Sequence, residues 1–316
     1  MPPTETERTA LPSPGSPVIS DWPGAHVAAG PYRLFVRRTP TREGAEPALF
    51  VHGLGGASTN WTDLMHLLAP RLAGEALDLP GFGRSDPPPG GDYRLEVHQR
   101  AVVAYLDEQG GRPVHLFGNS LGGAVCVRVA AARPDLVRTL TLVSPALPSL
   151  RLQRASDLQL VLLLLPGVRG MARRRLDRVD AETRSRAVLA TCFYDSSRIA
   201  PERLVLAAAE LRRRDSLPWT ADALLGSLRG LVASYVRRGP GGLWDCAGRI
   251  TCPTLIVWGR HDRLVSVRLA KRARAVIRGS RLLVIEDGGH VSQLEHPEMV
   301  ASAVLAMVGA QAEPGR

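Results

Sequence analysis

The segment Gly118-Asn-Ser-Leu-Gly122 limits what this chain can fold into more than any other. It lies between an apolar run at 114–117 and an Ala- and Val-rich stretch at 124–132, which predicts a strand, a sharp turn and a helix. A reversal this tight strains the backbone at the serine and leaves no space for neighbouring Cβ atoms. Both glycines are therefore needed, and the turn is expected to hold the Ser120 hydroxyl above the strand as a nucleophile.

Short apolar runs alternate with helical patterns on both sides of this turn. Further strand-like runs lie at 48–52, 74–79, 140–143, 254–258 and 282–285, and helical patterns at 95–109, 267–277 and 297–308. This alternation implies a mostly parallel sheet with helices on both faces. The alternation stops between 146 and 247, where helical patterns are separated by prolines. We expect that segment to be a helical insertion above the sheet.

The chain is therefore predicted to be an α/β protein in three parts. They are a flexible N-terminal tail at 1–28, a core made of 29–145 and 248–312, and a helical cap at 146–247. A chain of 316 residues with 45% apolar residues is long enough for such a core. No apolar run approaches the ~20 residues of a membrane span, and the N-terminus lacks a signal-peptide pattern. We expect a cytoplasmic protein, with association at a membrane surface as the open alternative.

A serine hydroxyl reacts only when a base removes its proton. His290 stands in Asp287-Gly-Gly-His290, directly after the strand-like run at 282–285. The two glycines allow a loop to bring the ring over Ser120, and an imidazole can accept and return a proton near neutral pH. His261 and His296 are weaker rivals, because His261 adjoins the candidate acid and His296 lies in a helix-start pattern.

The imidazole needs a carboxylate to orient it. Asp262 follows the strand-like run at 254–258 and is expected at the same sheet edge as Ser120 and His290. The order nucleophile, acid, base differs from the orders in chymotrypsin and subtilisin. Glu286 and Asp287 are rival acids, but both are too near His290 in sequence to reach its far ring nitrogen easily.

A tetrahedral intermediate also needs N–H donors for its oxyanion. The backbone of Leu121, directly after the nucleophile, is one candidate. Leu54 is the other, in the glycine-rich loop His52-Gly53-Leu-Gly-Gly56 that follows a strand-like run. Such loops also bind phosphates, but the chain has neither G-K-[ST] here nor G-x-G-x-x-G, so a dinucleotide site is disfavoured.

No metal or organic cofactor is expected. The cysteines, which have no C-x-x-C spacing, are Cys126, Cys192, Cys246 and Cys252. The eight histidines show no ligand spacing such as H-E-x-x-H. Small buried apolar side chains are the more economical interpretation of these cysteines.

The formal net charge of +10 does not indicate a nucleic-acid partner. A single lysine, Lys271, stands among 40 basic residues, which is typical of a GC-rich genome rather than of phosphate binding. Most of the excess charge lies between 151 and 247, with arginine triplets at 173–175 and 212–214. These triplets and the apolar run at 158–168 would suit an anionic lipid surface or an acyl chain. A solvated arginine face and ordinary core packing are the alternatives.

Taken together, five motifs resemble those of the α/β-hydrolase fold superfamily, in the serine-nucleophile branch with a helical cap. They are His52-Gly-Leu-Gly-Gly, Asp78-Leu-Pro-Gly-Phe-Gly-Arg-Ser85, Gly118-Asn-Ser-Leu-Gly-Gly123, Gly259-Arg-His-Asp262 and Gly288-Gly-His290. The resemblance spans roughly 29–308. It implies an eight-stranded-type sheet, a structural role for the loop from Asp78, and a cap that covers the pocket and selects the substrate.

The resemblance favours a hydrolase that cleaves a carboxylic ester with a hydrophobic part through an acyl-enzyme on Ser120. A serine here separates the chain from the haloalkane dehalogenases and epoxide hydrolases, whose nucleophile is aspartate. Carbon–carbon hydrolases of ring-cleavage products are the main alternative, since their elbow is similar to Gly-Asn-Ser-x-Gly-Gly. Val291 stands where they often have Trp. Thioesterases, perhydrolases and a non-catalytic ligand receptor on this fold remain further alternatives.

Overall fold

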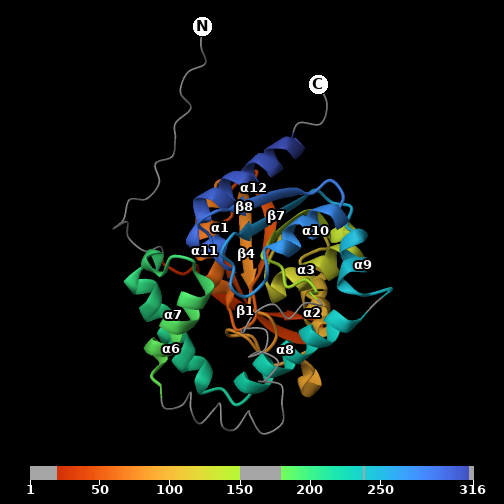
Figure 1. Ribbon diagram of the computed structural model, residues 1–316. Helices are drawn as coiled ribbons and strands as arrows, with labels where there is room; N and C mark the ends of the chain where they lie inside the picture. The colour runs from red at the N-terminus through yellow and green to blue at the C-terminus, as the bar shows by residue number, and fades with distance from the viewer. Residues whose placement is uncertain (1–19, 150–178, 238, 313–316) are drawn as a thin grey trace.

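An eight-stranded sheet forms the centre of the protein (Figure 1). The computed structural model describes residues 20–149, 179–237 and 239–312. The strand order is β1-β2-β4-β3-β5-β6-β7-β8. The strands are β1 (Gly24–Ala29), β2 (Tyr32–Arg38), β3 (Glu46–Val51), β4 (Leu72–Leu77), β5 (Val114–Asn119), β6 (Val137–Val143), β7 (Thr254–Gly259) and β8 (Arg281–Ile285). β2 runs antiparallel to β1 and β4, whereas the pairings from β4 to β8 are parallel. The predicted α/β class with a mostly parallel sheet is confirmed.

Helices cover both faces of this sheet. Helices α2 (Leu95–Glu108), α3 (Leu121–Ala132), α9 (Leu243–Gly248) and α10 (Arg268–Val276) pack on one face. Helices α1 (Thr62–Leu68) and α12 (Pro297–Ala312) pack on the other, near the short α11 (Ser292–Glu295). Successive side chains of β3 and β5 point to opposite faces, as a pleated strand requires. On the α1 and α12 side, the rings of Phe50 and Phe117 stack 4.2 Å apart.

The N-terminal hairpin is the main difference from the sequence prediction. β1 begins at Gly24, inside the segment predicted as a tail at 1–28, and β2 follows the turn at Gly30. β1 is an edge strand of mostly exposed Gly, Ala and His residues. An edge strand of this kind has no apolar run to reveal it, because little of its surface is buried. The expected strands after residue 45 are all present, with ends shifted by a few residues.

In the residues that the structure describes between β6 and β7, the regular elements are all helices. They include α6 (Ala181–Cys192), α7 (Pro201–Asp215) and α8 (Thr220–Val236), followed by α9. The first three lie along the lower side of the molecule in Figure 1, away from α12 at the top. Within the predicted cap at 146–247, Leu243, Cys246 and Ala247 of α9 pack on the α3 and α10 side of the sheet, and Ala223 and Leu231 of α8 join the same buried cluster. The expected apolar helix at 158–168 and the arginines at 173–175 lie outside the described residues.

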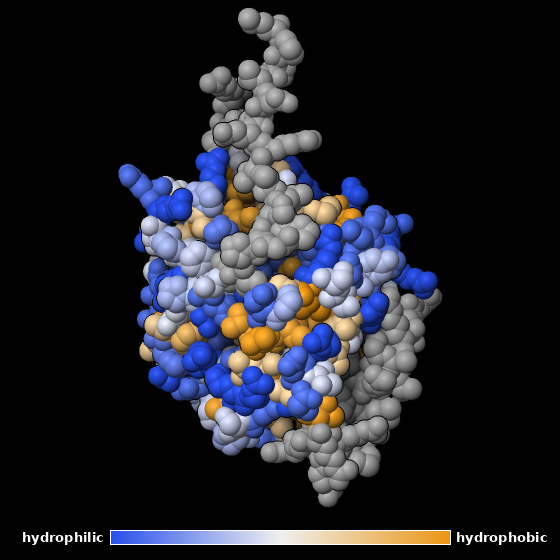
Figure 2. Space-filling view, turned by 90° about the vertical axis from the view of Figure 1, so that its left-hand side faces the viewer, coloured by the Kyte–Doolittle hydropathy of each residue, from blue (hydrophilic) through white to orange (hydrophobic). Residues whose placement is uncertain are grey.

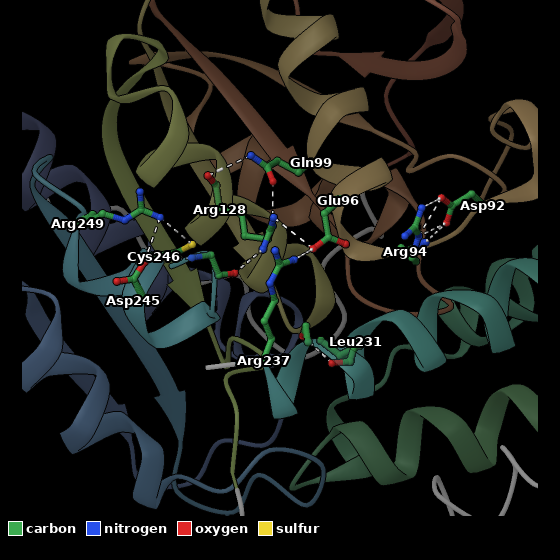
Figure 3. Close-up of polar contacts among 12 residues, drawn as sticks. Asp92, Arg94, Glu96, Gln99, Arg128, Leu231, Arg237, Asp245, Cys246 and Arg249 are labelled. Carbon is green, nitrogen blue, oxygen red and sulfur yellow. Dashed lines mark hydrogen bonds and ion pairs between the residues drawn. The ribbon is translucent and has the colours of Figure 1, made fainter. Parts of the chain in front are cut away.

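Polar contacts join α8 to the helices of the core (Figure 3). The Glu96 carboxylate of α2 pairs with Arg128 of α3 at 3.3 Å and with Arg237, directly after α8, at 3.1 Å. Arg128 also donates a 2.9 Å hydrogen bond to the carbonyl of Gly241, just before α9. The chain leaving α8 is thus fixed to the core by charged side chains. No helix in the described residues has the length and apolar character needed to cross a bilayer.

Candidate active site

The turn between β5 and α3 places Ser120 at the carboxyl end of a central strand. Ser120 has φ 51° and ψ −116°, a left-handed conformation that is strained for a non-glycine residue. The flanking glycines have a direct steric cause. A Cβ on Gly118 would lie 2.6 Å from the carbonyl oxygen of Gly122, and one on Gly122 would lie 2.3 Å from that of Val51. The turn closes only because both positions lack a side chain.

Asp262 and His290 meet at the end of β7. One carboxylate oxygen of Asp262, Oδ2, lies 2.9 Å from His290 Nδ1, and both side chains are buried. The other oxygen accepts 2.8 Å hydrogen bonds from the N–H groups of Leu264 and Val265. Burial alone raises the pKa of Asp262, but His290 and these N–H groups outweigh burial and leave the pKa below its usual value. An ionised Asp262 is therefore available to orient His290.

Asn119 ties the histidine loop to the serine turn. Its Nδ2 donates hydrogen bonds to the carbonyl of His290 at 3.2 Å and to that of Val143 at 3.0 Å. Because Asn119 directly precedes Ser120, the backbones that carry the hydroxyl and the imidazole are held together. The structure thus brings three distant chain segments, around residues 120, 262 and 290, to one edge of the sheet.

The glycine-rich loop after β3 lies against Ser120. A Cβ on Gly53 would be only 3.1 Å from the Cβ of Ser120. The carbonyl of Gly53 accepts hydrogen bonds from Gly56 N–H at 3.0 Å and from His52 Nδ1 at 2.7 Å. In a trans peptide the N–H points away from the preceding C=O, so the Leu54 N–H is directed opposite to these contacts. Leu121 opens α3, and the N–H groups of a first helical turn have no partner within the helix.

His52 fixes this loop as a neutral imidazole. Leu79 N–H donates to its Nε2 at 2.9 Å, so Nδ1 carries the proton that binds the Gly53 carbonyl. Burial lowers the pKa of His52, which keeps the ring uncharged. Asp78, also buried, supports the far side of the loop: its carboxylate accepts from Ser58 N–H at 2.5 Å and from Arg84 N–H at 2.8 Å. The motif from Asp78 thus has a bracing role in the fold.

The family model that describes the alpha/beta hydrolase fold matches residues 47–297. The chain belongs to this family. A 2-hydroxy-6-oxononadienedioate/2-hydroxy-6-oxononatrienedioate hydrolase of Klebsiella pneumoniae is 30% identical over 286 residues, which cover 89% of this chain and 93% of the relative. The chain is a hydrolase of the α/β-hydrolase fold.

Solved structures on the same fold carry different activities in their names. A 2-hydroxy-6-oxo-6-phenylhexa-2,4-dienoate hydrolase from Rhodococcus sp. strain RHA1 has a TM-score of 0.75 at 19% identity, with 90% of this chain and 98% of that chain covered. A membrane phospholipase A, named as a bacterial virulence factor, also has a TM-score of 0.75, at 23% identity, with coverage of 92% and 87%. At these identities the likeness concerns the fold alone, so the fold does not choose the bond that is cleaved.

The rival residues of the sequence analysis lie elsewhere in this α/β hydrolase. His261 is exposed and stacks on the ring of Tyr194 at 4.1 Å. Glu286 is 72% exposed and pairs with Arg260 at 2.6 Å. Asp287 is 61% exposed, and its backbone carbonyl lies 3.0 Å from His296 Nε2. None of these contacts involves His290, which is paired with Asp262.

Two residues of this hydrolase were not singled out as site residues from the sequence. Asn119 was noted only as part of the serine motif. The other is Glu295, which is 3% exposed and whose carboxylate accepts from Gly289 N–H at 2.6 Å and from Asp195 N–H at 2.8 Å. It thereby joins the histidine loop to the segment between α6 and α7. Nothing in the local sequence marks Glu295, because its partners come from distant parts of the chain.

The histidine loop also contacts the end of α6 directly. His290 N–H donates a 2.6 Å hydrogen bond to the carbonyl of Cys192. A Cβ on Gly289 would lie 2.4 Å from the same oxygen, so only glycine permits this approach. Among the residues that the structure describes, no group of three or more His, Cys, Asp or Glu side chains is arranged to hold a metal ion.

Proposed function

We propose that this protein hydrolyses a carbon–carbon bond in a 2-hydroxy-6-oxo dienoic acid. The observation that carries the proposal is the 30% identity, along 89% of the chain, with a hydrolase named for such an acid. The elbow Gly118-Asn-Ser-Leu-Gly-Gly123, similar to that of carbon–carbon hydrolases, supports the same conclusion. This choice revises the preference for an ester substrate that the sequence motifs alone favoured.

Each group of the site has a role in this reaction. His290, oriented by Asp262, takes the proton of the Ser120 hydroxyl as the oxygen attacks the ketone carbon, C6. The N–H groups of Leu54 and Leu121 donate to the oxyanion that forms there. These roles require the Ser120 oxygen, His290 Nε2 and both N–H groups to face one substrate carbonyl.

Bond cleavage needs a stabilised leaving group. Transfer of the enol proton of the dienoic acid to C5 converts it to a ketone at C2 with a C3–C4 double bond. When the C5–C6 bond breaks, its electron pair is then delocalised to the C2 oxygen, which takes the proton that His290 received from Ser120, and a 2-hydroxydienoate leaves. The acyl group on Ser120 is released as a carboxylic acid by a water molecule that His290 deprotonates.

Ester hydrolysis is the second candidate. It needs the same attack and the same oxyanion donors, but the leaving group is an alkoxide that takes its proton from His290. Val291 favours this candidate, because an aliphatic side chain follows the histidine where the carbon–carbon hydrolases often have Trp.

A direct comparison of substrates tests the proposal. We expect kcat/KM for a 2-hydroxy-6-oxo dienoic acid, followed by loss of its absorbance, to exceed that for p-nitrophenyl esters of any acyl length. Ser120→Ala should lower kcat by about 10⁵-fold or more, because loss of the nucleophile removes the covalent route. Ser302→Ala, at an exposed position of α12, is the matched control and should leave kcat unchanged. Faster turnover of esters than of the dienoic acid would replace the proposal by the second candidate.

A further inference from the structure

Two adjacent arginines at the C-terminal end of α7 point toward loops of the core. Arg213 donates a hydrogen bond from Nη2 to the carbonyl of Gly83, and Arg214 donates one from Nη1 to the carbonyl of Gly55. Of the triplet expected to face anionic lipid, Arg212 is exposed, whereas Arg213 and Arg214 are partly buried. The guanidinium groups of these two are engaged with the protein itself.

Arg214 lies where burial disfavours its positive charge. Its Nε is buried and has no hydrogen-bond partner in the described part of the chain. Burial lowers the pKa of Arg214, against the opposing influence of Glu210 and Asp215. Arg213, in contrast, pairs with Glu210 at 2.6 Å. A buried N–H without a partner and a partly buried charge both cost free energy of folding. The placement of Arg214 is therefore poorly explained by stabilisation of the fold alone.

The partner of Arg214 belongs to the loop that lies against Ser120. Gly53 to Gly56 form a turn closed by the Gly56 N–H, and Gly55 has φ +69°, which favours glycine. A turn with three glycines has many alternative conformations. His52 and Gly56 hold the Gly53 carbonyl from within the core, whereas the Gly55 carbonyl is held from α7.

We infer that Arg214 is a positioning residue that holds the loop from Gly53 to Gly56 so that the Leu54 N–H faces the reacting carbonyl. The inference rests on the proposed function, in which that N–H stabilises the oxyanion. Arg214 also places its charge beside the same loop, where it favours a developing negative charge. Both effects act on the oxyanion and not on the uncharged ketone carbonyl of the bound substrate, so they should appear in kcat rather than in KM.

The experiment compares variants of two arginines on the same helix. Arg214→Ala removes the charge and the hydrogen bond, Arg214→Gln retains a donor without the charge, and Arg214→Lys retains both. Arg203→Ala is the matched control. Arg203 is also partly buried in α7 and bonds Asp63 of α1 and Asp21, so its loss weakens the attachment of α7 without touching the loop.

Three measurements are made on each full-length variant: kcat and KM, the inhibition constant of a trifluoromethyl ketone that forms an oxyanion on Ser120, and the rate of Ser120 labelling by a fluorophosphonate. Losing one oxyanion donor typically lowers kcat by ~10²- to 10³-fold, and misplacing one should lower it by ~10-fold. For Arg214→Ala we therefore expect a fall of that size in kcat, in labelling rate and in ketone affinity, with KM nearly unchanged. Arg214→Lys should restore most of each loss.

The inference is overturned if Arg203→Ala and Arg214→Ala lower kcat equally, since attachment of α7 would then be the cause. It is equally overturned if Arg214→Ala changes only KM or only the thermal stability. Failure of the proposed function looks different. In that case the unchanged protein would turn over esters better than the dienoic acid, while the labelling comparison between Arg214 and Arg203 variants would still decide the role of Arg214.

Discussion

The edge of the sheet and the helices α6 to α8 are held in different ways. At the sheet edge, one backbone segment packs directly on another: the glycines at 118, 122 and 259 permit approaches that no side chain would allow. Helices α6 and α8 each have one such close contact with the core, at Gly289 and Gly230. Helix α7 between them is attached through long charged side chains, among them Arg203 and Arg214. The first kind of contact tolerates little displacement, whereas the second leaves room for rotamer changes. The groups proposed for chemistry thus lie on the more rigid contacts, and α7 beside them is held by the more adaptable ones.

Exposure of apolar side chains separates the two regions as well. Among the described residues, the large apolar side chains that are exposed include six between 188 and 236, but only Met299 outside that range. The six are Val188, Tyr194, Val205, Leu206, Leu224 and Val236. Figure 2 shows hydrophobic residues gathered in the middle of one face, with hydrophilic residues around them. Helices that bury less apolar surface are less strongly stabilised, which is typical of elements that move for substrates.

The largest expected effect comes from the polar pair at the sheet edge. Asp262→Asn keeps the size of the side chain but removes the charge that orients His290, and kcat should fall by about 10³- to 10⁴-fold. Steady-state turnover of the best substrate measures this. Glu286→Gln, an exposed carboxylate near His290 in sequence, is the control and should change kcat by less than about twofold. Equal losses of kcat in both variants would mean that Asp262 is not the acid that orients His290.

The backbone contacts of the sheet edge are tested by stability. Gly122→Ala places a methyl group 2.3 Å from the Val51 carbonyl, so the free energy of unfolding should fall by about 3 kcal/mol. Gly309→Ala, in α12 with open space around it, should leave that energy unchanged or raise it by up to about 1 kcal/mol. Urea denaturation of both variants measures the difference. A stable Gly122→Ala protein would show that the edge is as adaptable as the helices.

The smallest expected effect concerns the contact between α8 and the core helix α2. His98 of α2 is 2.9 Å from Ser227 Oγ of α8, and burial, aided by His52, lowers the pKa of His98 to about 3. Between that value and the unfolded pKa of about 6.5, the unfolded chain binds the extra proton, so stability falls as the pH falls. From pH 6 to pH 5 the protein should lose about 1 kcal/mol more stability than His98→Gln does. Parallel stability–pH curves for the two proteins would contradict this.

Much of the fold could be predicted because its signals are local. The runs at 114–117, 140–143 and 254–258 belong to strands buried on both faces, and they are largely apolar in sequence. The hairpin of β1 and β2 escaped prediction, because β1 lies at an edge and is mostly exposed. The sequence also did not predict that the side chains of Arg213 and Arg214 point toward loops of the core. A run of charged residues by itself indicates a solvated face. Only the fold shows whether a backbone carbonyl from a distant loop lies within reach of these side chains.

By itself, the sequence determined the turn at Ser120, since its two glycines and its place between a strand and a helix encode that geometry locally. It also pointed to Asp262 and His290 as the candidate acid and base, through their positions after strands. Only the tertiary structure decided which oxygen of Asp262 faces His290, that Asn119 binds the His290 carbonyl, and that Glu295 and Arg214 hold opposite loops. Hydrogen bonds between residues far apart in the chain depend on where the whole sheet places its strand ends, and no local pattern carries that information.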